Sequence, residues 1–260
     1  MELKDTVAIV TGGARGIGRG VALALAREGV HVVIADLPSA RAEMEETGAL
    51  VEEAGVQALL VHCDVRDWSQ VSALASTTLE RFGRIDVLVN NAGVISVAPV
   101  VAMSEEAWDQ VLDVNLKGTF LCCKAVAPHM IERRSGRIVN MSSIAGRRGQ
   151  PAVAHYCASK FGLIGFTQSL ARELAPFDVT VNAVCPGEVD SAMWREHLLP
   201  ALAATQGSTQ EEAWAAFIRE RVPLGRAQTP EQIGEAVVYL CRADNVTGES
   251  LGVTGGSEPG

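Results

Sequence analysis

Two side chains within residues 154–162, AHYCASKFG, have types and a spacing that suit proton transfer. Tyr156 is one of only two tyrosines in the chain, and Lys160 follows it by four residues. On a helix, positions i and i+4 share one face, so the phenol and the ammonium would lie side by side. A free phenol has a pKa of about 10 and is a poor base at neutral pH. A cation about 4 Å away would stabilise phenolate by about 4 kcal/mol at an effective dielectric constant of about 20, which brings that pKa close to 7.

A phenolate of this kind can take a proton from an alcohol while hydride leaves for an oxidised nicotinamide, whose positive ring would assist Lys160. In the reverse direction, the phenol protonates a carbonyl oxygen. Ser143 stands 13 residues before Tyr156, in VNMSSIAG, and offers a hydroxyl that could hold the substrate oxygen, with Ser142 as its competitor. A tyrosine and a lysine at this spacing also fit an ordinary helix surface, so the interpretation depends on what else the chain carries.

A glycine-rich segment, TGGARGIG at residues 11–18, follows the first apolar run and opens the first helical pattern. Glycine lets the backbone approach a pyrophosphate closely, and a helix N-terminus supplies free N–H donors and the positive end of a dipole. The spacing is G-x-x-x-G-x-G, because G-x-G-x-x-G would need glycine where Ala14 and Ile17 stand. A purely structural turn is the alternative. The residues that we assign to a cofactor-binding loop are Gly12, Arg15, Gly16, Ile17 and Gly18.

Asp36 ends the second apolar run, 18 residues after Gly18. A carboxylate at this point accepts hydrogen bonds from the adenosine ribose hydroxyls of a dinucleotide. The 2′-phosphate of NADP would meet it as like charge meets like charge, which is costly at a desolvated site. Arg15 acts in the opposite sense, because a basic residue in the loop can bind that phosphate. We expect Asp36 to prevail and the cofactor to be NAD; a solvated loop aspartate is the alternative.

The elements that must position these residues alternate along the chain. Short β-branched runs are followed by amphipathic helical patterns, which is typical of a parallel sheet covered by helices on both faces. We predict one α/β domain over residues 1–260, a doubly wound Rossmann fold with a seven-stranded parallel sheet. The expected strands cover residues 6–11, 31–36, 58–64, 85–90, 137–143, 179–187 and 250–253. The expected helices cover residues 16–28, 39–54, 67–82, 104–132, 155–175 and 230–242, the last opened by Thr229 and Pro230.

Small or polar residues follow the third and fourth expected strands. The carboxyl ends of the strands line the ligand crevice of such a sheet, so we expect these residues to touch the cofactor. Each of them could also serve a turn alone. The residues concerned are Asp64, Val65, Asn91, Ala92 and Gly93.

Residues 190–222 interrupt the alternation between a strand and the next helix. The segment is rich in large apolar side chains, among them Trp194, Trp214 and Phe217. We interpret it as a small substrate-binding lid. A plain packing helix is an equally good explanation of the same residues.

Charge and composition exclude several other classes of function. The formal net charge is −9, and an acidic surface repels nucleic acid and anionic membranes, so neither is an expected partner. The start of the sequence has no basic segment followed by a long apolar one, and no apolar run approaches about 20 residues, so we expect a cytoplasmic protein. The six cysteines form no C-x-x-C pair and accompany no histidine cluster, so we expect no metal site.

Taken together, these motifs resemble the short-chain dehydrogenase/reductase family over essentially the whole chain. The matching features are TGGARGIG, Asp64, the NNAG of residues 90–93, Asn115 in VNLKG, Ser143, Tyr156 with Lys160, Asn182, and Pro186-Gly187. The resemblance implies a catalytic tetrad of Asn115, Ser143, Tyr156 and Lys160, in which Asn115 distorts its helix and holds a water that Lys160 contacts. It further implies cofactor contacts from Asn91, Tyr156, Lys160, Pro186, Gly187, Val189 and Ser191, where Ser191 replaces the family's usual threonine.

The expected reaction interconverts a secondary alcohol and its ketone with NAD. The stretches GEVDSAMW and GRRGQPAVAHY resemble the polyol and sugar-alcohol dehydrogenases of the family, and the candidate substrate residues are Gln150, Glu188 and Trp194. Gln150 and Glu188 could hydrogen-bond substrate hydroxyls, or could simply face solvent. One alternative is a 3-oxoacyl-[acyl-carrier-protein] or general carbonyl reductase, which Asp36 disfavours because it disfavours NADP. The other is a non-catalytic NAD-binding protein, which would not need Tyr156.

Two helices, at 104–132 and 155–175, carry apolar residues on more than one face. Examples are Phe120, Leu121, Phe161, Leu163, Ile164 and Phe166. One domain can bury only one face of a helix against its sheet. The remaining apolar residues predict contact between subunits, which in the resembling family usually means a homotetramer.

Overall fold

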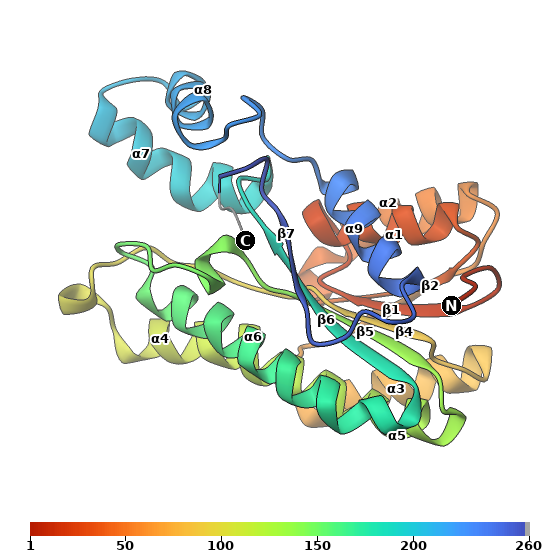
Figure 1. Cartoon of the computed structure of the whole chain (residues 1–260). Coiled ribbons are helices and arrows are strands. Elements are labelled where there is room, and N and C mark those ends of the chain that lie inside the picture. Colours follow the sequence, from red (N-terminus) through yellow and green to blue (C-terminus); the bar gives the residue numbers. More distant parts are fainter. Residues whose placement is uncertain (258–260) are drawn as a thin grey trace.

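The computed structural model describes residues 1–257, with the side chains of all of these except residues 197 and 201. Seven parallel strands form one sheet in the order β3-β2-β1-β4-β5-β6-β7, with helices on both faces (Figure 1). The predicted doubly wound fold is therefore confirmed. The strands are β1 Val7–Thr11, β2 His31–Asp36, β3 Ala58–His62, β4 Val87–Asn90, β5 Gly136–Met141, β6 Val179–Pro186 and β7 Ser250–Val253.

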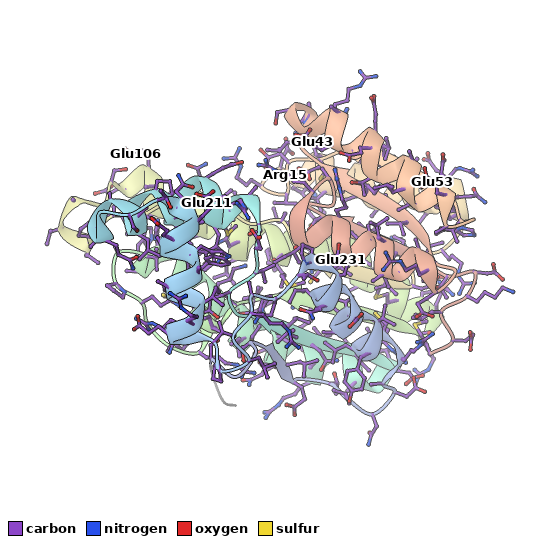
Figure 2. The ribbon with its side chains drawn as sticks, turned by 90° about the horizontal axis from the view of Figure 1, so that it is seen from above. Arg15, Glu43, Glu53, Glu106, Glu211 and Glu231 are labelled. Atoms are coloured by element: carbon purple, nitrogen blue, oxygen red, sulfur yellow. The ribbon has the colours of Figure 1, made fainter. Side chains whose placement is uncertain are left out.

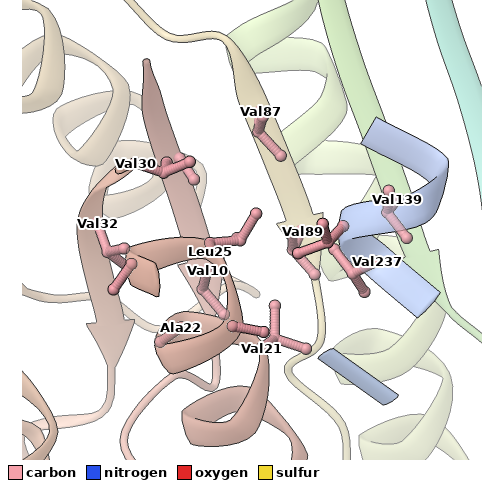
Figure 3. Packing of buried hydrophobic residues seen from close by; sticks show 14 of the residues in the cluster. Val10, Val21, Ala22, Leu25, Val30, Val32, Val87, Val89, Val139 and Val237 are labelled. Atoms are coloured by element: carbon pink, nitrogen blue, oxygen red, sulfur yellow. The ribbon is translucent and has the colours of Figure 1, made fainter. Parts of the chain in front are cut away.

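Successive residues of the central strands point to opposite faces of the sheet, and both faces are apolar. In β1, Ala8 and Val10 belong to one hydrophobic cluster, whereas Val7 and Ile9 belong to the other. This alternation explains why the strands read as continuous apolar runs rather than as alternating ones. Figure 3 shows part of the first cluster, in which Val21, Ala22 and Leu25 of one helix lie beside valines of the sheet such as Val10 and Val32.

The helices divide between the two faces. Those packed on the first cluster are α1 Gly16–Arg27, α2 Arg41–Glu53 and α9 Pro230–Arg242. The opposite face carries α3 Trp68–Phe82, α4 Glu105–Leu112, α5 Gly118–Arg133 and α6 Ala154–Leu174 (Figure 1). Thr229 caps α9 through a capping box with Gln232 and Pro230 follows it, as the sequence predicts. Among the helices of residues 1–257, none has the length and apolar character needed to cross a membrane.

The predicted helix at 104–132 is two helices joined by one π-helical turn, Asp113–Lys117. Asn115 lies in this turn and is buried. Its carbonyl accepts the Thr119 hydroxyl at 3.0 Å. Such π-turns often mark functional sites, and this one places the asparagine side chain toward the end of β4 rather than along the helix.

Residues 190–222 form a separate excursion above the carboxyl ends of the strands. After a π-turn at Trp194–Leu198 come α7 Leu199–Gln206 and α8 Gln210–Arg221 (Figure 1). The rings of Trp194, Trp214 and Phe217 pack together, with centroids 5.1–6.3 Å apart. A parallel bridge between Val189 and Gln228 joins the two ends of the excursion.

Helices α1 and α9 approach each other through two glycines, Gly20 and Gly234. A Cβ atom added to Gly234 would lie 2.6 Å from the Gly20 carbonyl oxygen. A Cβ atom added to Gly20 would collide with the Pro230 backbone. The absence of side chains at these two positions therefore sets the distance between α1 and α9.

We predict that Gly234→Ala lowers the free energy of unfolding by about 1–3 kcal/mol, because the backbone of α1 cannot move aside as a side chain can. The control is Gly48→Ala in α2, whose added Cβ would meet the tip of the half-exposed Leu60 side chain at 3.1 Å. It should change stability by less than about 1 kcal/mol. Urea unfolding of both variants makes the comparison, and equal effects would contradict the packing argument.

Candidate active site

A single cavity of about 1080 Å³ lies between the carboxyl ends of the strands and the excursion of α7 and α8. Every predicted cofactor and substrate residue lines it, and so do three of the four predicted catalytic residues. Asn115 is the predicted residue that does not line it. The predicted lining residues are Gly12, Arg15, Gly16, Ile17, Gly18, Asp36, Asp64, Val65, Asn91, Ala92, Gly93, Ser143, Gln150, Tyr156, Lys160, Pro186, Gly187, Glu188, Val189, Ser191 and Trp194.

The glycine loop presents bare backbone to this cavity. Gly12 and Gly16 have positive φ angles of 62° and 56°, which other residues rarely adopt. A Cβ added to Gly18 would collide with the Gly12 carbonyl. Helix α1 begins at Gly16, so its unpaired N–H groups face the same space. This cradle fits the pyrophosphate of a dinucleotide, with Gly12, Gly16 and Gly18 keeping the approach open.

Asp36 lies at the end of β2 and beside the glycine loop. Its two carboxylate oxygens accept the backbone N–H groups of Ala14 at 3.1 Å and Leu37 at 2.8 Å. These bonds fix the carboxylate, and each oxygen keeps a second lone pair for a further donor. The geometry fits a ribose hydroxyl pair.

Further along the sheet edge, Asp64 is paired with Arg66, with 2.6 Å between Nη2 and Oδ2. This pair lowers the pKa of the Asp64 carboxyl, the side-chain hydrogen bond being the main cause. Arg66 also lines the cavity. The wall at this point is therefore an ion pair and not a lone carboxylate.

The end of β4 is fastened to the glycine loop by two polar side chains. Asn91 donates through Nδ2 to the carbonyls of Thr11 and Gly12 at 3.0 and 2.9 Å. The Thr11 hydroxyl accepts the N–H groups of Asn91 and Ala92, both at 3.1 Å. Thr11 is thus a positioning residue. In the sequence it ends the first strand and opens TGGARGIG, and neither position indicates that it fastens β4.

At the other end of the cavity, Tyr156 lies in the first turn of α6 and Lys160 one turn later. The Lys160 ammonium is buried, 5.5 Å from the centroid of the Tyr156 ring, and donates to the Met141 carbonyl at 2.7 Å. The two serines separate in role. Ser142 donates to the Lys160 carbonyl at 3.0 Å, whereas Ser143 accepts the Ala145 N–H at 3.1 Å and hydrogen-bonds Tyr156.

Burial shifts the pKa values of this pair in opposite directions. Burial raises the pKa of Tyr156 to about 12, and the side-chain hydrogen bond with Ser143 acts to lower it. Burial likewise lowers the pKa of Lys160 to about 8. With the protein's own side chains alone, the phenol does not reach a pKa close to 7. The expectation also invokes the positive ring of an oxidised nicotinamide, so it stays a prediction for the assembled site. Loss of water destabilises the phenolate more than its neighbours stabilise it.

Asn115 does not line the cavity and acts on it through the residues that it hydrogen-bonds. Its Oδ1 accepts the Val94 N–H at 2.8 Å, and its Nδ2 donates to the Val94 carbonyl at 3.0 Å and to Ser159 Oγ at 3.1 Å. The Ser159 hydroxyl in turn donates to the Tyr156 carbonyl at 2.7 Å. Asn115 thus ties the segment after β4 to α6. Ser159 lies within the Tyr156–Lys160 motif, but the spacing of that motif alone does not indicate its positioning role.

The end of β6 supplies the remaining wall. Gly187 donates its N–H to the Val253 carbonyl at 3.0 Å, and Val189 pairs with Gln228. Glu188 is only 2% exposed and accepts the Ser257 hydroxyl at 2.9 Å, so it is not a solvent-facing loop residue. Burial raises the pKa of the Glu188 carboxyl, while the Ser257 hydrogen bond and, to a smaller extent, Arg148 and Arg221 act to lower it.

Arg148 and Arg221 both line the cavity and were not anticipated from the sequence. One lies in the connection after β5 and the other at the end of α8, so no motif joins them. Phe217, which packs on Trp194, also lines the cavity. The apolar residues of the excursion therefore pack among themselves, and some of them also line the cavity. A substrate-binding lid and a packing helix are thus compatible interpretations of this segment.

The sequence is similar to a known protein family and to proteins whose activity is known. Residues 6–199 match the family model described as short chain dehydrogenase. The chain is 42% identical to a galactitol 2-dehydrogenase of Agrobacterium fabrum, with 99% of each chain covered.

Two solved structures superpose closely. A single-residue variant of actinorhodin polyketide ketoreductase with NADPH has a TM-score of 0.92 and 39% identity, with 97% of each chain covered. An NAD+-bound xylitol dehydrogenase has a TM-score of 0.91 and 34% identity, and the alignment covers 98% of this chain and 100% of that one. The two structures hold different nicotinamide cofactors and differ in the substrate class that their names state.

We predict that the Tyr156 phenol stays protonated in the cofactor-free protein at about pH 10, where an ordinary phenol is half ionised. Ultraviolet titration can follow this because the chain has only two tyrosines. The signal of Tyr156→Phe subtracted from that of the parent protein isolates one phenol, and the same subtraction in denaturant gives the unperturbed reference. Extra phenolate in the folded parent protein below about pH 10 would contradict the burial argument.

Proposed function

The chain belongs to the short-chain dehydrogenase family, and we propose that it is an NAD-dependent oxidoreductase that interconverts a secondary alcohol and its ketone. The proposed substrates are polyols, sugar alcohols or diols. One observation carries the proposal: a single cavity holds a carboxylate suited to ribose at one end and Ser143, Tyr156 and Lys160 at the other. A cofactor bound along the glycine loop would reach from the first to the second.

When bound, a nicotinamide ring exchanges hydride with the substrate carbon. The chain's own task is to move the proton and to hold the reacting oxygen. In oxidation, Tyr156 accepts the proton of the substrate hydroxyl, and in reduction it donates a proton to the carbonyl oxygen. Ser143 Oγ accepts the Ala145 N–H, so its single hydroxyl hydrogen remains for donation to the substrate oxygen.

Lys160 and Asn115 support that proton transfer in different ways. With a pKa of about 8, Lys160 is mostly charged at neutral pH and lowers the free energy of the phenolate. Positive charge added near the phenol acts in the same direction, so proton transfer becomes feasible only in the assembled site. Asn115 acts as a positioning residue through Val94 and Ser159.

The preference for NAD rests on Asp36. Two backbone N–H groups hold its carboxylate at the end of β2, where a 2′-phosphate would have to lie. Separating such a phosphate from water beside a fixed carboxylate is unfavourable. A ribose with free hydroxyls would instead donate to it.

The polyol assignment draws on the substrate end of the cavity and on likeness. Gln150, Glu188 and the two arginines give this end hydrogen-bonding groups for several hydroxyls. The galactitol and xylitol dehydrogenases are the relatives whose names state such substrates. A carbonyl reductase of the 3-oxoacyl or polyketide type is the second candidate, favoured by the 39% identical ketoreductase. A non-catalytic binding protein has no use for the buried Lys160 beside Tyr156.

A reducing compartment such as the cytoplasm is part of the proposal. All six cysteines lie within the described residues, where each is buried and none is in a disulfide. Burial raises the pKa of the Cys123 and Cys241 thiols to about 12, which keeps them protonated and unreactive. They serve as small core side chains.

A homotetramer is the proposed assembly. Phe120 and Phe161 remain 44% and 45% exposed on α5 and α6, whereas Leu121 and Leu163 are buried in the core. A small groove beside Phe120 is lined mainly by apolar residues, with the ion pair of Asp113 and Lys117 among them: Leu112, Asp113, Leu116, Lys117, Phe120, Gly162 and Phe166. Contact with a second copy of the chain would cover these rings.

We predict that the purified protein forms NADH from NAD with at least one compound of a panel containing galactitol, xylitol, other sugar alcohols and vicinal diols. Tyr156→Phe should reduce kcat by about 10²–10⁴-fold, since general acid–base catalysis contributes that much. The NADH dissociation constant should change little, which separates loss of chemistry from loss of folding. If no compound of the panel yields NADH, and ketones or acyl thioesters are reduced instead, the carbonyl reductase function is favoured.

We predict a mass of four chains in light scattering, and dissociation on Phe161→Glu. The charge would have to be buried in the subunit contact, which costs several kcal/mol. Leu60→Lys, at a similarly exposed apolar residue on the edge strand β3, is the control and should leave the mass unchanged. A monomer in the parent protein would contradict the assembly proposal.

A further inference from the structure

One ion pair connects the cofactor loop to the lid, which we define as residues 190–222. Arg15 Nη1 lies 3.6 Å from Glu196 Oε1, and both side chains are a little more than half exposed. Both residues also line the large cavity, so the pair spans the gap between two of its walls. Figure 2 places Arg15 at the end of α1 that faces the lid.

Arg15 is the loop residue that could bind a 2′-phosphate. Its backbone is extended, with φ −150° and ψ 175°, and it stands at the N-cap of α1 without making a side-chain cap bond. The guanidinium is therefore positioned by its surroundings, and Glu196 is the acidic group that the structure pairs with it. Asp36 is bonded to the N–H of Ala14, the neighbour of Arg15 in the loop, and lines the same cavity.

We propose that Glu196 is a specificity-determining residue for the cofactor, because its carboxylate competes with a 2′-phosphate for Arg15. This inference rests on the proposed NAD preference and extends it from β2 to the lid. A dinucleotide with a 2′-phosphate has to displace Glu196 to gain Arg15, and still faces Asp36. A dinucleotide without that phosphate leaves the ion pair intact.

The expected effect is modest, because the pair is exposed. Exposed ion pairs contribute little, and salt screens them further. Asp36 is held by two short backbone hydrogen bonds and has the larger influence on the cofactor. Glu196 therefore adds to a discrimination that Asp36 dominates.

The test is Glu196→Gln, with dissociation constants for NAD and NADP measured by titration calorimetry at low salt. NADP should bind about three- to fivefold more tightly, and the ratio of the two constants should shift by that factor. Glu211→Gln is the matched control. It removes the same charge from α8 of the lid (Figure 2) at a residue that does not line the cavity, and it should leave the ratio unchanged.

A double-mutant cycle identifies the mechanism. In an Arg15→Gln background, Glu196→Gln should have no effect on the ratio, because the competed guanidinium is gone. An equal shift in that background, or an equal shift from Glu211→Gln, would mean that only the overall charge of the lid matters and would overturn the proposal. An unchanged ratio for Glu196→Gln would overturn it as well. If the parent protein prefers NADP, the proposed NAD dependence is refuted. The double-mutant cycle would still measure whether Glu196 acts on the NAD/NADP ratio through Arg15.

Discussion

The hydrogen bond from the buried Lys160 ammonium to the Met141 carbonyl holds the chemical end of the site together. It joins α6 to the last residue of β5, and Ser142 completes the junction by donating to the Lys160 carbonyl. Because β5 continues directly into Ser142 and Ser143, these bonds fix the Ser143 hydroxyl relative to the tyrosine. A buried ammonium is costly unless it is paired or hydrogen-bonded. Burying Lys160 therefore lowers the stability of the fold while it fixes the position of the side chains around it. Its depressed pKa of about 8 is the sign of that cost.

A second set of bonds brings the cofactor end into register with the chemical end. Asn91 and Thr11 fasten β4 to the glycine loop, and Asn115 fastens the segment after β4 to α6. The π-turn makes the last connection possible, because a regular helix would carry Asn115 to another angle. The proposed catalytic residues are few, and the polar side chains that hold them lie on or beside β1, β4, β5 and α6.

Most of the fold could be predicted, because parallel strands buried on both faces give long apolar runs that are easy to locate. The glycine loop, Asp36 and the Tyr156–Lys160 pair were found from short-range spacing. The family resemblance implies that Asn115 distorts its helix, but the helical pattern continues through Asp113–Lys117 without a break and does not show that the distortion is a π-turn. Arg148, Arg221 and Ser257 reach the substrate end from distant segments, and only tertiary structure brings them together. The sequence shows the cation near Tyr156 but not the depth of burial, so the rise of the phenol's pKa in the chain alone could not be predicted.

The bridge between Val189 and Gln228 closes the neck of the lid excursion, with Asp190 N–H bonded to the Gln228 carbonyl and Gln228 N–H to that of Glu188. Above the neck, Trp194, Trp214 and Phe217 form a small core of their own. Residues 190–222 thus form a unit whose two ends are fixed to each other and whose side chains pack among themselves. Such a unit can be lengthened, shortened or exchanged during evolution while the redox apparatus beneath it stays as it is. New substrate ranges can then arise through one segment of the gene.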